Sequence, residues 1–382
     1  MQNARTDTPI TWGSGTDLLF VAVGILVAGF FAKLPMYVDL PDLGHIAGER
    51  FQPTVAHNYY ARNMGFFILP VLIVFFCWEK SLRLGQTLVV VSAILISFIY
   101  INYLPGVPRH YGDTVTLAFI HAPLFLWFVM GMTYVQIDFR ALNERLEFLR
   151  YSSDLIVLSV LILLAGMILT LITIALFSTI NLNIAELYYE YVVVYGLVGA
   201  PIVANYIISL NPTIVRKISP LIARIFSPLI LGTVVAYLIS AVYTGKDPYN
   251  DREFLLVFNW LLILVMAIVI FSIVELRQRQ SKWNFWFTTL LVITTIVVDA
   301  VALSGIGYRI LEWGFTPNRI VVLGENVLIL THLILIMTGL VKLISKKQTI
   351  KVLDSSVLGY LPIYGVWTAF VVFIFPVAHG FK

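Results

Sequence analysis

The chain has 382 residues, of which 59% are hydrophobic and only 12% are charged. Soluble globular proteins carry about 25% charged residues, so this composition excludes an ordinary soluble domain and indicates an integral membrane protein. The formal net charge of +4 is small, and no long basic run points to nucleic-acid binding. The single cysteine, Cys77, excludes an intramolecular disulfide and any cysteine-based zinc site.

Eleven apolar runs predict membrane-spanning helices, since a spanning helix needs about 20 mostly apolar residues. The first run follows a polar segment and lacks a small-residue cleavage site, so we expect a retained helix rather than a signal peptide. No sizeable soluble segment remains, and the prediction is an all-α polytopic transmembrane helix bundle forming a single integral membrane domain, 1–382. The expected spans are roughly 16–33, 65–79, 85–104, 114–137, 154–179, 188–210, 227–244, 253–275, 284–304, 318–344 and 357–378.

The distribution of positive charge predicts the orientation of these helices. Cytoplasmic loops of membrane proteins carry an excess of Lys and Arg. In an eleven-helix arrangement, most of the 25 Lys and Arg residues fall on the side that holds the N-terminus. We therefore expect the N-terminus inside and the C-terminus outside. The odd number of spans argues against a simple pair of inverted repeats.

Most of the histidines fall on or near the expected outer side. A metal or pH-sensing site is one interpretation of such a group. Their spacing forms no ligand motif, such as two histidines one helical turn apart, so no metal site is predicted. The residues concerned are His45, His57, His110, His121 and His379.

The stretch "GYRILEWGFTPNRIVVLGEN", residues 307–326, joins the ninth expected span to the tenth on the outer side. Thr316 and Pro317 predict a helix start, because Thr caps the first turn and Pro is preset for the first helical position. Gly314 suits a tight turn. Arg309 and Glu312 are three residues apart and can pair if this segment is helical.

Arg319 is the least expected residue of this stretch. It lies in the first turn of the tenth span, where the helix macrodipole disfavours a cation, so we expect an acidic partner or a bound anion. Tyr308 and Trp313 suit the aromatic belt of a membrane interface. The alternative interpretation of the whole stretch is an anchored interfacial turn without a ligand.

Four ionisable residues fall inside expected spans: His121, Asp299, Glu325 and His332. Charge inside a membrane is expensive and usually faces a bundle interior or a watery cavity. At 1.5 Å per residue, Asp299 should lie about 9 Å and Glu325 about 12 Å below the outer surface. His121 should lie at a similar depth, and His332 shares a helix face with Glu325. We expect one outer-half polar pocket; the alternative is hydrogen bonding between helices that serves packing alone.

Two further polar residues within spans, Asn205 and Asn259, are more typical of hydrogen bonds between helices. Motifs of known catalytic sites, such as G-x-S-x-G, H-E-x-x-H and the Walker A sequence, are not found. An intramembrane enzyme that uses the ionisable residues is the less favoured hypothesis, and no cofactor is expected.

Three segments resemble a family of bacterial polytopic membrane proteins, domain of unknown function 4153. "YRILEWGFTPNRIVVL" is similar to its Y-R-I-x-x-[YW]-G-x-T-x-x-R signature, "YYARNMGFFILPVLIVFF" to its R-N segment, and "HAPLFLWFVMG" to its H-x-P-x-x-x-W helix start. The resemblance implies a bacterial inner-membrane protein and supplies no activity. It places these residues on motif positions: Tyr308, Arg309, Gly314, Thr316, Arg319, Arg62, Asn63, His121 and Trp127.

The favoured functional hypothesis is a transporter or permease, in which an outer-side polar vestibule binds a small solute or ion. The first alternative is a non-catalytic scaffold, sensor or accessory subunit of an envelope complex. The second is an intramembrane enzyme acting on lipid-linked substrates. The expected partners are the lipid bilayer and a small solute or ion, with no nucleic acid.

Overall fold

The computed structural model describes residues 15–37, 59–105, 112–138, 140–179, 184–210, 252–278, 282–345 and 351–381, together with residues 232, 235, 239 and 249. All regular secondary structure in these ranges is helical, and they contain no β-strand. The predicted all-α class is confirmed for this part of the chain.

Nine helices among the described residues are long and apolar enough to cross a membrane. Each overlaps one of the runs expected from the sequence, and together they indicate a multi-pass membrane protein. Their bounds are Gly15–Tyr37, Tyr59–Glu79, Leu84–Tyr103, Asp113–Tyr134, Leu142–Leu171, Ala185–Leu210, Phe285–Trp313, Pro317–Ile344 and Leu353–Ala378.

The two other expected spans have different outcomes. The run at 253–275 falls in the 27-residue helix Arg252–Gln278, of which Leu262–Val274 stands as a shorter apolar helix among the described residues. The run at 227–244 lies outside the described residues except for three isolated positions. The count of about eleven spans and the orientation of the termini therefore stay predictions.

The chain packs as two compact units, and residues 1–38 and 151–219 form the first. Within it, α1 packs along α8. Asn205 accepts a hydrogen bond from the Tyr151 hydroxyl at 2.8 Å, across α8 and α6, which confirms the interhelical role predicted for this residue. The helices are α1 (Gly15–Tyr37), α6 (Leu142–Thr179, shared with the second unit), α7 (Ala185–Leu187), η2 (Tyr188–Val193) and α8 (Val194–Leu210).

The first unit also buries one cation. The ammonium group of Lys33 lies 3.1 Å from the Glu190 carboxylate and 3.3 Å from the centre of the Tyr191 ring. Lys33 is fully buried, whereas the Glu190 side chain is 37% exposed. Glu190 therefore neutralises the charge of Lys33, and Tyr191 covers its ammonium group, as a membrane-embedded cation requires.

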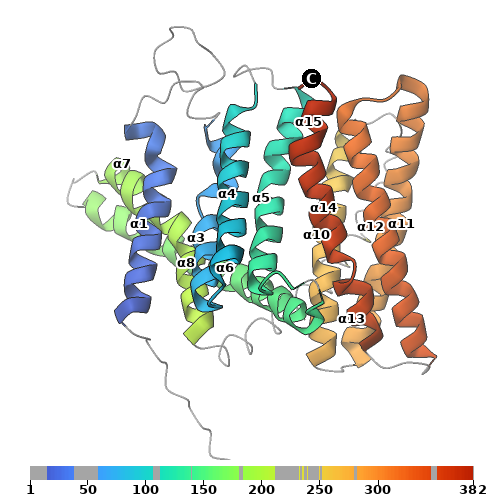
Figure 1. The fold of residues 1–382 in the computed structure, drawn as a ribbon, viewed down its shortest axis with the longest axis horizontal. Helices are drawn as coiled ribbons and strands as arrows, with labels where there is room; N and C mark the ends of the chain where they lie inside the picture. Colours follow the sequence, from blue (N-terminus) through green and yellow to red (C-terminus); the bar gives the residue numbers. More distant parts are fainter. Residues whose placement is uncertain are drawn as a thin grey trace, which may run out of the picture. The chain divides into compact units, whose positions relative to one another are not determined.

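Residues 39–150 and 220–382 form the second unit, which holds all four ionisable residues singled out above. Helix α5 is its hub, because it packs against α3, α4, α12 and α14 (Figure 1). The elements are η1 (Met64–Phe66), α3 (Leu69–Glu79), α4 (Leu84–Tyr103), α5 (Asp113–Tyr134), α10 (Arg252–Gln278), α11 (Lys282–Trp313), α12 (Pro317–Ile344), α13 (Lys351–Leu358), α14 (Leu361–Ala369), η3 (Phe370–Ile374) and α15 (Phe375–Ala378).

The core of the second unit consists of apolar clusters at the contacts between its helices. The largest joins α10, α11, α12 and α13 with the start of α6, and a second joins α4, α5 and η3. Lipid tails are as apolar as these side chains, so close packing and hydrogen bonds hold such helices together rather than the hydrophobic effect alone. Polar side chains that bridge the clusters therefore fix which helices meet.

The connection between α11 and α12 is shorter than the sequence suggested. The ninth span was expected to end near residue 304, but α11 continues to Trp313 and leaves only a three-residue turn before Pro317. Gly314 ends the helix with a φ of 76°, which disfavours residues that carry a side chain. Asp299 consequently lies 14 residues from the end of its helix, much deeper than predicted.

Candidate functional site

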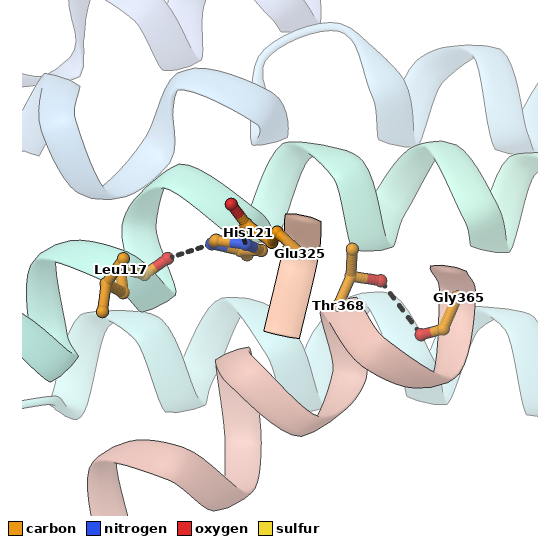
Figure 2. A network of polar contacts seen from close by, with 5 residues as sticks. All are labelled: Leu117, His121, Glu325, Gly365 and Thr368. Atoms are coloured by element: carbon orange, nitrogen blue, oxygen red, sulfur yellow. Dashed lines mark hydrogen bonds and ion pairs between the residues drawn. The ribbon is translucent and has the colours of Figure 1, made fainter. Parts of the chain in front are cut away.

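His121 of α5 and Glu325 of α12 form a polar contact inside the second unit (Figure 2). The ring nitrogen Nε2 of His121 lies 2.5 Å from Oε1 of Glu325, although the two residues are 204 positions apart. The other ring nitrogen, Nδ1, lies 2.8 Å from the backbone carbonyl oxygen of Leu117, one turn earlier in α5. Both members are shielded from solvent, with side chains 5% and 18% exposed. The predicted equal depth of these two residues agrees with their contact.

The hydrogen-bond partners of His121 determine how many protons the pair holds. A carbonyl oxygen can only accept, so Nδ1 must carry a hydrogen atom and donate it to Leu117. At the other side of the ring, Nε2 faces a carboxyl oxygen, and two lone pairs would repel each other. One further proton therefore lies between Nε2 and Oε1, on either the imidazole or the carboxyl group. In both arrangements the pair is neutral overall, as a membrane interior favours.

Helix α14 closes one side of this pair. A Cβ atom at Gly324 would lie 2.2 Å from the Trp367 ring, so glycine at this position allows α12 and α14 to approach. The indole Nε1 of Trp367 is buried without a hydrogen-bond partner among the described residues. Thr368 follows on the same helix and lies beside the pair in Figure 2, with its hydroxyl donating to the Gly365 carbonyl at 2.9 Å.

A small apolar cluster lies one helical turn from the pair. Leu117 precedes His121 by four residues, and Val321 precedes Glu325 by four, so both lie on the side of the pair where α5 and α12 begin. These two residues form one cluster with Val371 and Phe375, in which none is more than 8% exposed. The cluster therefore covers the pair from that end of the two helices.

A second polar group lies deeper in the same unit. The His332 ring stacks on Tyr360 with a centroid distance of 4.6 Å, and its Nδ1 lies 3.1 Å from the Tyr364 hydroxyl. Tyr364 also lies within electrostatic range of Asp299. Asp299 is fully buried, and within the described ranges neither of its carboxyl oxygens has a hydrogen-bond partner.

The four ionisable residues thus occupy two levels rather than one pocket. From the α11–α12 turn, Glu325 lies about 12 Å deep, whereas Asp299 and His332 lie about 21 and 22 Å deep at 1.5 Å per residue. The predicted meeting of Asp299 and Glu325 at one depth is wrong, because the expected end of α11 was nine residues too early. His121 joins Glu325 at the upper level, and His332 joins Asp299 at the lower.

Arg319 has backbone partners rather than the acidic partner or anion that we expected. Its Nη1 donates to the carbonyl oxygens of Trp313 and Gly314 at 3.1 and 2.7 Å. These carbonyls end α11, where backbone acceptors lack helical partners and the macrodipole is negative. The predicted helix cap is confirmed, because the Thr316 hydroxyl accepts the Arg319 backbone N–H at 3.4 Å. Arg319 therefore fastens the turn between α11 and α12.

The other residues of the outer-face motif near this turn have structural contacts as well. The Nε atom of Arg309 donates to the Tyr249 carbonyl at 3.1 Å, and its guanidinium group lies 5.4 Å from the Trp313 ring. Tyr308 contacts Tyr249 edge to face with centroids 5.4 Å apart. Glu312 is exposed in the last turn of α11. The motif accordingly builds an anchored turn, which was the alternative interpretation.

Arg62 and Asn63 serve a different helix end. Nη1 of Arg62 donates to three carbonyl oxygens at the end of α4, those of Ile101, Asn102 and Leu104, at 2.8 to 3.1 Å. Asn63 exchanges two side-chain hydrogen bonds with Asn102 at 2.9 and 2.8 Å. Both residues are buried, so they fix the end of α4 rather than offer a binding surface.

Asn259 and Trp127 each contact a residue of another helix. Asn259 accepts a hydrogen bond from Asn326 at 3.1 Å and so joins α10 to α12, as predicted. Trp127 packs against Phe148 with ring centroids 5.2 Å apart. The described residues contain no group of three or more metal-ligating side chains.

The sequence reasoning missed the contribution of the last span. Tyr360, Tyr364 and Thr368 recur every four residues, a spacing that places them on one helix face. This spacing was the available signal. Tyr360 and Tyr364 contact His332 at the lower level, and Thr368 lies nearer the upper pair in Figure 2.

Comparison with known proteins assigns no relative. No family model, no curated protein and no solved structure matches the chain. The resemblance to domain of unknown function 4153 therefore stays a prediction.

Proposed function

We propose that this multi-pass membrane protein is a proton-coupled carrier of a small solute or ion, and that His121 and Glu325 bind the coupling proton. The observation that carries the proposal is the contact between Nε2 of His121 on α5 and Oε1 of Glu325 on α12, which requires one proton between the two atoms while Nδ1 donates to Leu117. Ionisable residues inside membrane segments are rare and commonly belong to ion and proton pathways. The pair lies in the hub of the second unit, where α5 meets α12.

The geometry gives a simple physical basis for coupling. If α5 and α12 move apart, His121 keeps its bond to Leu117, while Glu325 loses its imidazole partner. An unpaired carboxylate in an apolar environment is unfavourable, so separation changes how strongly the pair holds its proton. A solute that binds one arrangement of the two helices better than the other is then linked to proton binding, and the linkage is reciprocal.

The apolar cluster of Leu117, Val321, Val371 and Phe375 supports this proposal. A carrier must separate its binding site from one side of the membrane at a time. The cluster covers the pair from the ends of α5 and α12 that begin at Asp113 and Pro317. We assign it the role of a closed gate on that side.

The resemblance noted above supports the bacterial cytoplasmic membrane as the location. Such membranes sustain a proton gradient, which the proposed carrier would use.

The test uses the purified full-length protein in liposomes that contain a pH-sensitive dye. A panel of small amino acids, sugars, carboxylic acids and alkali cations is added outside, and the internal pH is recorded. At least one member of the panel should move protons with the wild type, and none should with Glu325→Gln. Glu312→Gln, which changes an exposed carboxylate at the end of α11, serves as the control and should behave like the wild type.

Two results would overturn the proposal. One is wild-type liposomes in which no member of the panel changes the internal pH. The other is a Glu325→Gln variant that moves protons as fast as the wild type. Either would leave the pair as an interhelical clamp, and an accessory subunit of an envelope complex would become the better hypothesis.

A further inference from the structure

Asp299 lies in the middle of α11, far from both ends of the helix. It is fully buried, and both carboxyl oxygens lack a hydrogen-bond partner among the residues that the structure describes. Tyr364 lies within electrostatic range of it without a hydrogen bond, and His332 contacts the Tyr364 hydroxyl. No hydrogen bond that joins the described helices uses this carboxyl group.

An ionised carboxylate does not fit these surroundings. Burying an isolated charge in an apolar medium is so unfavourable that a carboxyl group takes up a proton instead. The helices packed around Asp299 supply no Lys or Arg at this level. Helix α10 has no titratable residue from 254 to 274, and the cations of α11 and α12 lie at their ends. The titratable groups that α12 and α14 present are Glu325, His332 and Tyr364, with Tyr360 at the start of α14.

A bound metal cation fits no better. Hard cations require several oxygen ligands around them. Within the described part of the chain, neither carboxyl oxygen of Asp299 has a hydrogen-bond partner, and no group of three or more metal-ligating side chains occurs. A proton needs only one oxygen atom, so it is the ligand that the surroundings favour.

We infer that Asp299 is a proton-binding site in its own right, and that its carboxyl group is a neutral acid in this conformation. Tyr364, whose charge state Asp299 influences, and His332, which contacts the Tyr364 hydroxyl, are the groups through which we expect its proton to be exchanged. The inference that Asp299 is protonated does not depend on transport. Its role as a second binding site for the coupling proton, deeper than His121 and Glu325, rests on the proposed function.

The test is infrared spectroscopy of the full-length protein in lipid bilayers at neutral pH. A protonated carboxylic acid has a carbonyl stretching band that an ionised carboxylate lacks. The protein is prepared once unlabelled and once with aspartate carrying ¹³C in its side-chain carboxyl group, which shifts the band of aspartic acid but not that of glutamic acid. We expect a band that shifts with the label, is lost in Asp299→Asn and persists in Glu325→Gln.

The outcomes separate this inference from the proposed function. A wild-type spectrum without a label-sensitive acid band at neutral pH overturns the inference without any variant, so a misfolded Asp299→Asn cannot obscure the result. A label-sensitive band that survives in Asp299→Asn also overturns it, because another aspartate is then the acid. In Asp299→Glu the band should remain but lose its response to the aspartate label. The transport result for Glu325→Gln and these spectra are independent, so either proposal can fail while the other stands.

Discussion

Replacing Glu325 by glutamine or by leucine should separate two roles of the His121–Glu325 pair, its hold on two helices and its hold on a proton. A glutamine amide can donate an N–H to Nε2 of His121, while Nδ1 keeps its bond to Leu117. The contact between α5 and α12 then survives without the shared proton. Leucine offers no donor and leaves the buried imidazole nitrogen without a partner.

The two substitutions should therefore differ in stability. Leaving a buried acceptor unsatisfied costs about 1–3 kcal/mol, and hydrogen bonds between membrane helices contribute about 0.6 kcal/mol on average and about 1.7 kcal/mol at most. We expect Glu325→Leu to lower the free energy of unfolding by about 1–2 kcal/mol, and Glu325→Gln by less than about 1 kcal/mol. The solvent-shielded position of His121 and its second anchor at Leu117 place the leucine effect at the upper end.

The measurement is reversible unfolding of the purified protein in mixed micelles, with the helical signal followed as denaturing detergent is added. His121→Leu and the double variant with Glu325→Leu complete a double-mutant cycle. Glu312→Leu, at an exposed position, is the control and should change little. Equal destabilisation by glutamine and leucine would refute the reasoning, because it would mean that the carboxyl group holds the helices through its charge. A coupling energy near zero would refute the contact itself.

Three further predictions concern packing and polar anchors in the same unit. Gly324→Ala places a Cβ atom 2.2 Å from the Trp367 ring and should destabilise the protein by about 1–3 kcal/mol. Gly307→Ala is the control, because nothing lies within 4 Å of a Cβ atom there. Equal thermal midpoints of the two variants would contradict this prediction. Arg62→Ala removes a charged donor from three carbonyls and should cost about 1.5–3 kcal/mol, with partial recovery in Arg62→Lys; a neutral alanine variant would disprove the capping role. Asn326→Ala removes the hydrogen bond to α10 and should lower the free energy of unfolding by about 0.6–1.7 kcal/mol. An unchanged thermal midpoint would contradict this.

Apolar run length and local capping signals were enough to predict much of this fold. Each of the nine candidate spans among the described residues overlaps an expected run, because length and hydropathy alone specify such helices. The cap at Thr316 followed from Thr and Pro at adjacent positions, since this chemistry is local. The similar depth of His121 and Glu325 followed from counting residues from two helix starts that were predicted within one residue.

The depth of Asp299 was predicted wrongly for a related reason. Charged and polar residues after Ser304 ended the apolar run, but a helix continues through an interface as long as its backbone is hydrogen-bonded. Gly314, with its positive φ, is the true end of α11. Hydropathy shows where a helix leaves the hydrocarbon, not where its backbone hydrogen bonds stop. As a result, Asp299 lies nine residues farther from the end of α11 than predicted.

The partners of individual side chains could not be predicted from one sequence. Arg319 was expected to need an acid, yet the carbonyls at the end of the preceding helix satisfy it because the turn is only three residues long. Glu325 contacts His121, which is 204 residues away in the sequence, and no local sequence pattern predicts a contact between residues so far apart. Tyr364 was overlooked because a tyrosine in an apolar run is usually packing, and only its position beside His332 and Asp299 gives it another role.

The most direct test of proton coupling at Glu325 is the simultaneous measurement of proton and solute movement in the same liposomes, with a solute that the panel identifies. Wild-type protein should move the two together and accumulate the solute when a pH gradient is imposed. Glu325→Gln, which mimics the protonated pair, should let the solute equilibrate across the membrane without moving protons and without accumulation. Accumulation of the solute by Glu325→Gln in response to the pH gradient would contradict the assignment of the coupling proton to His121 and Glu325.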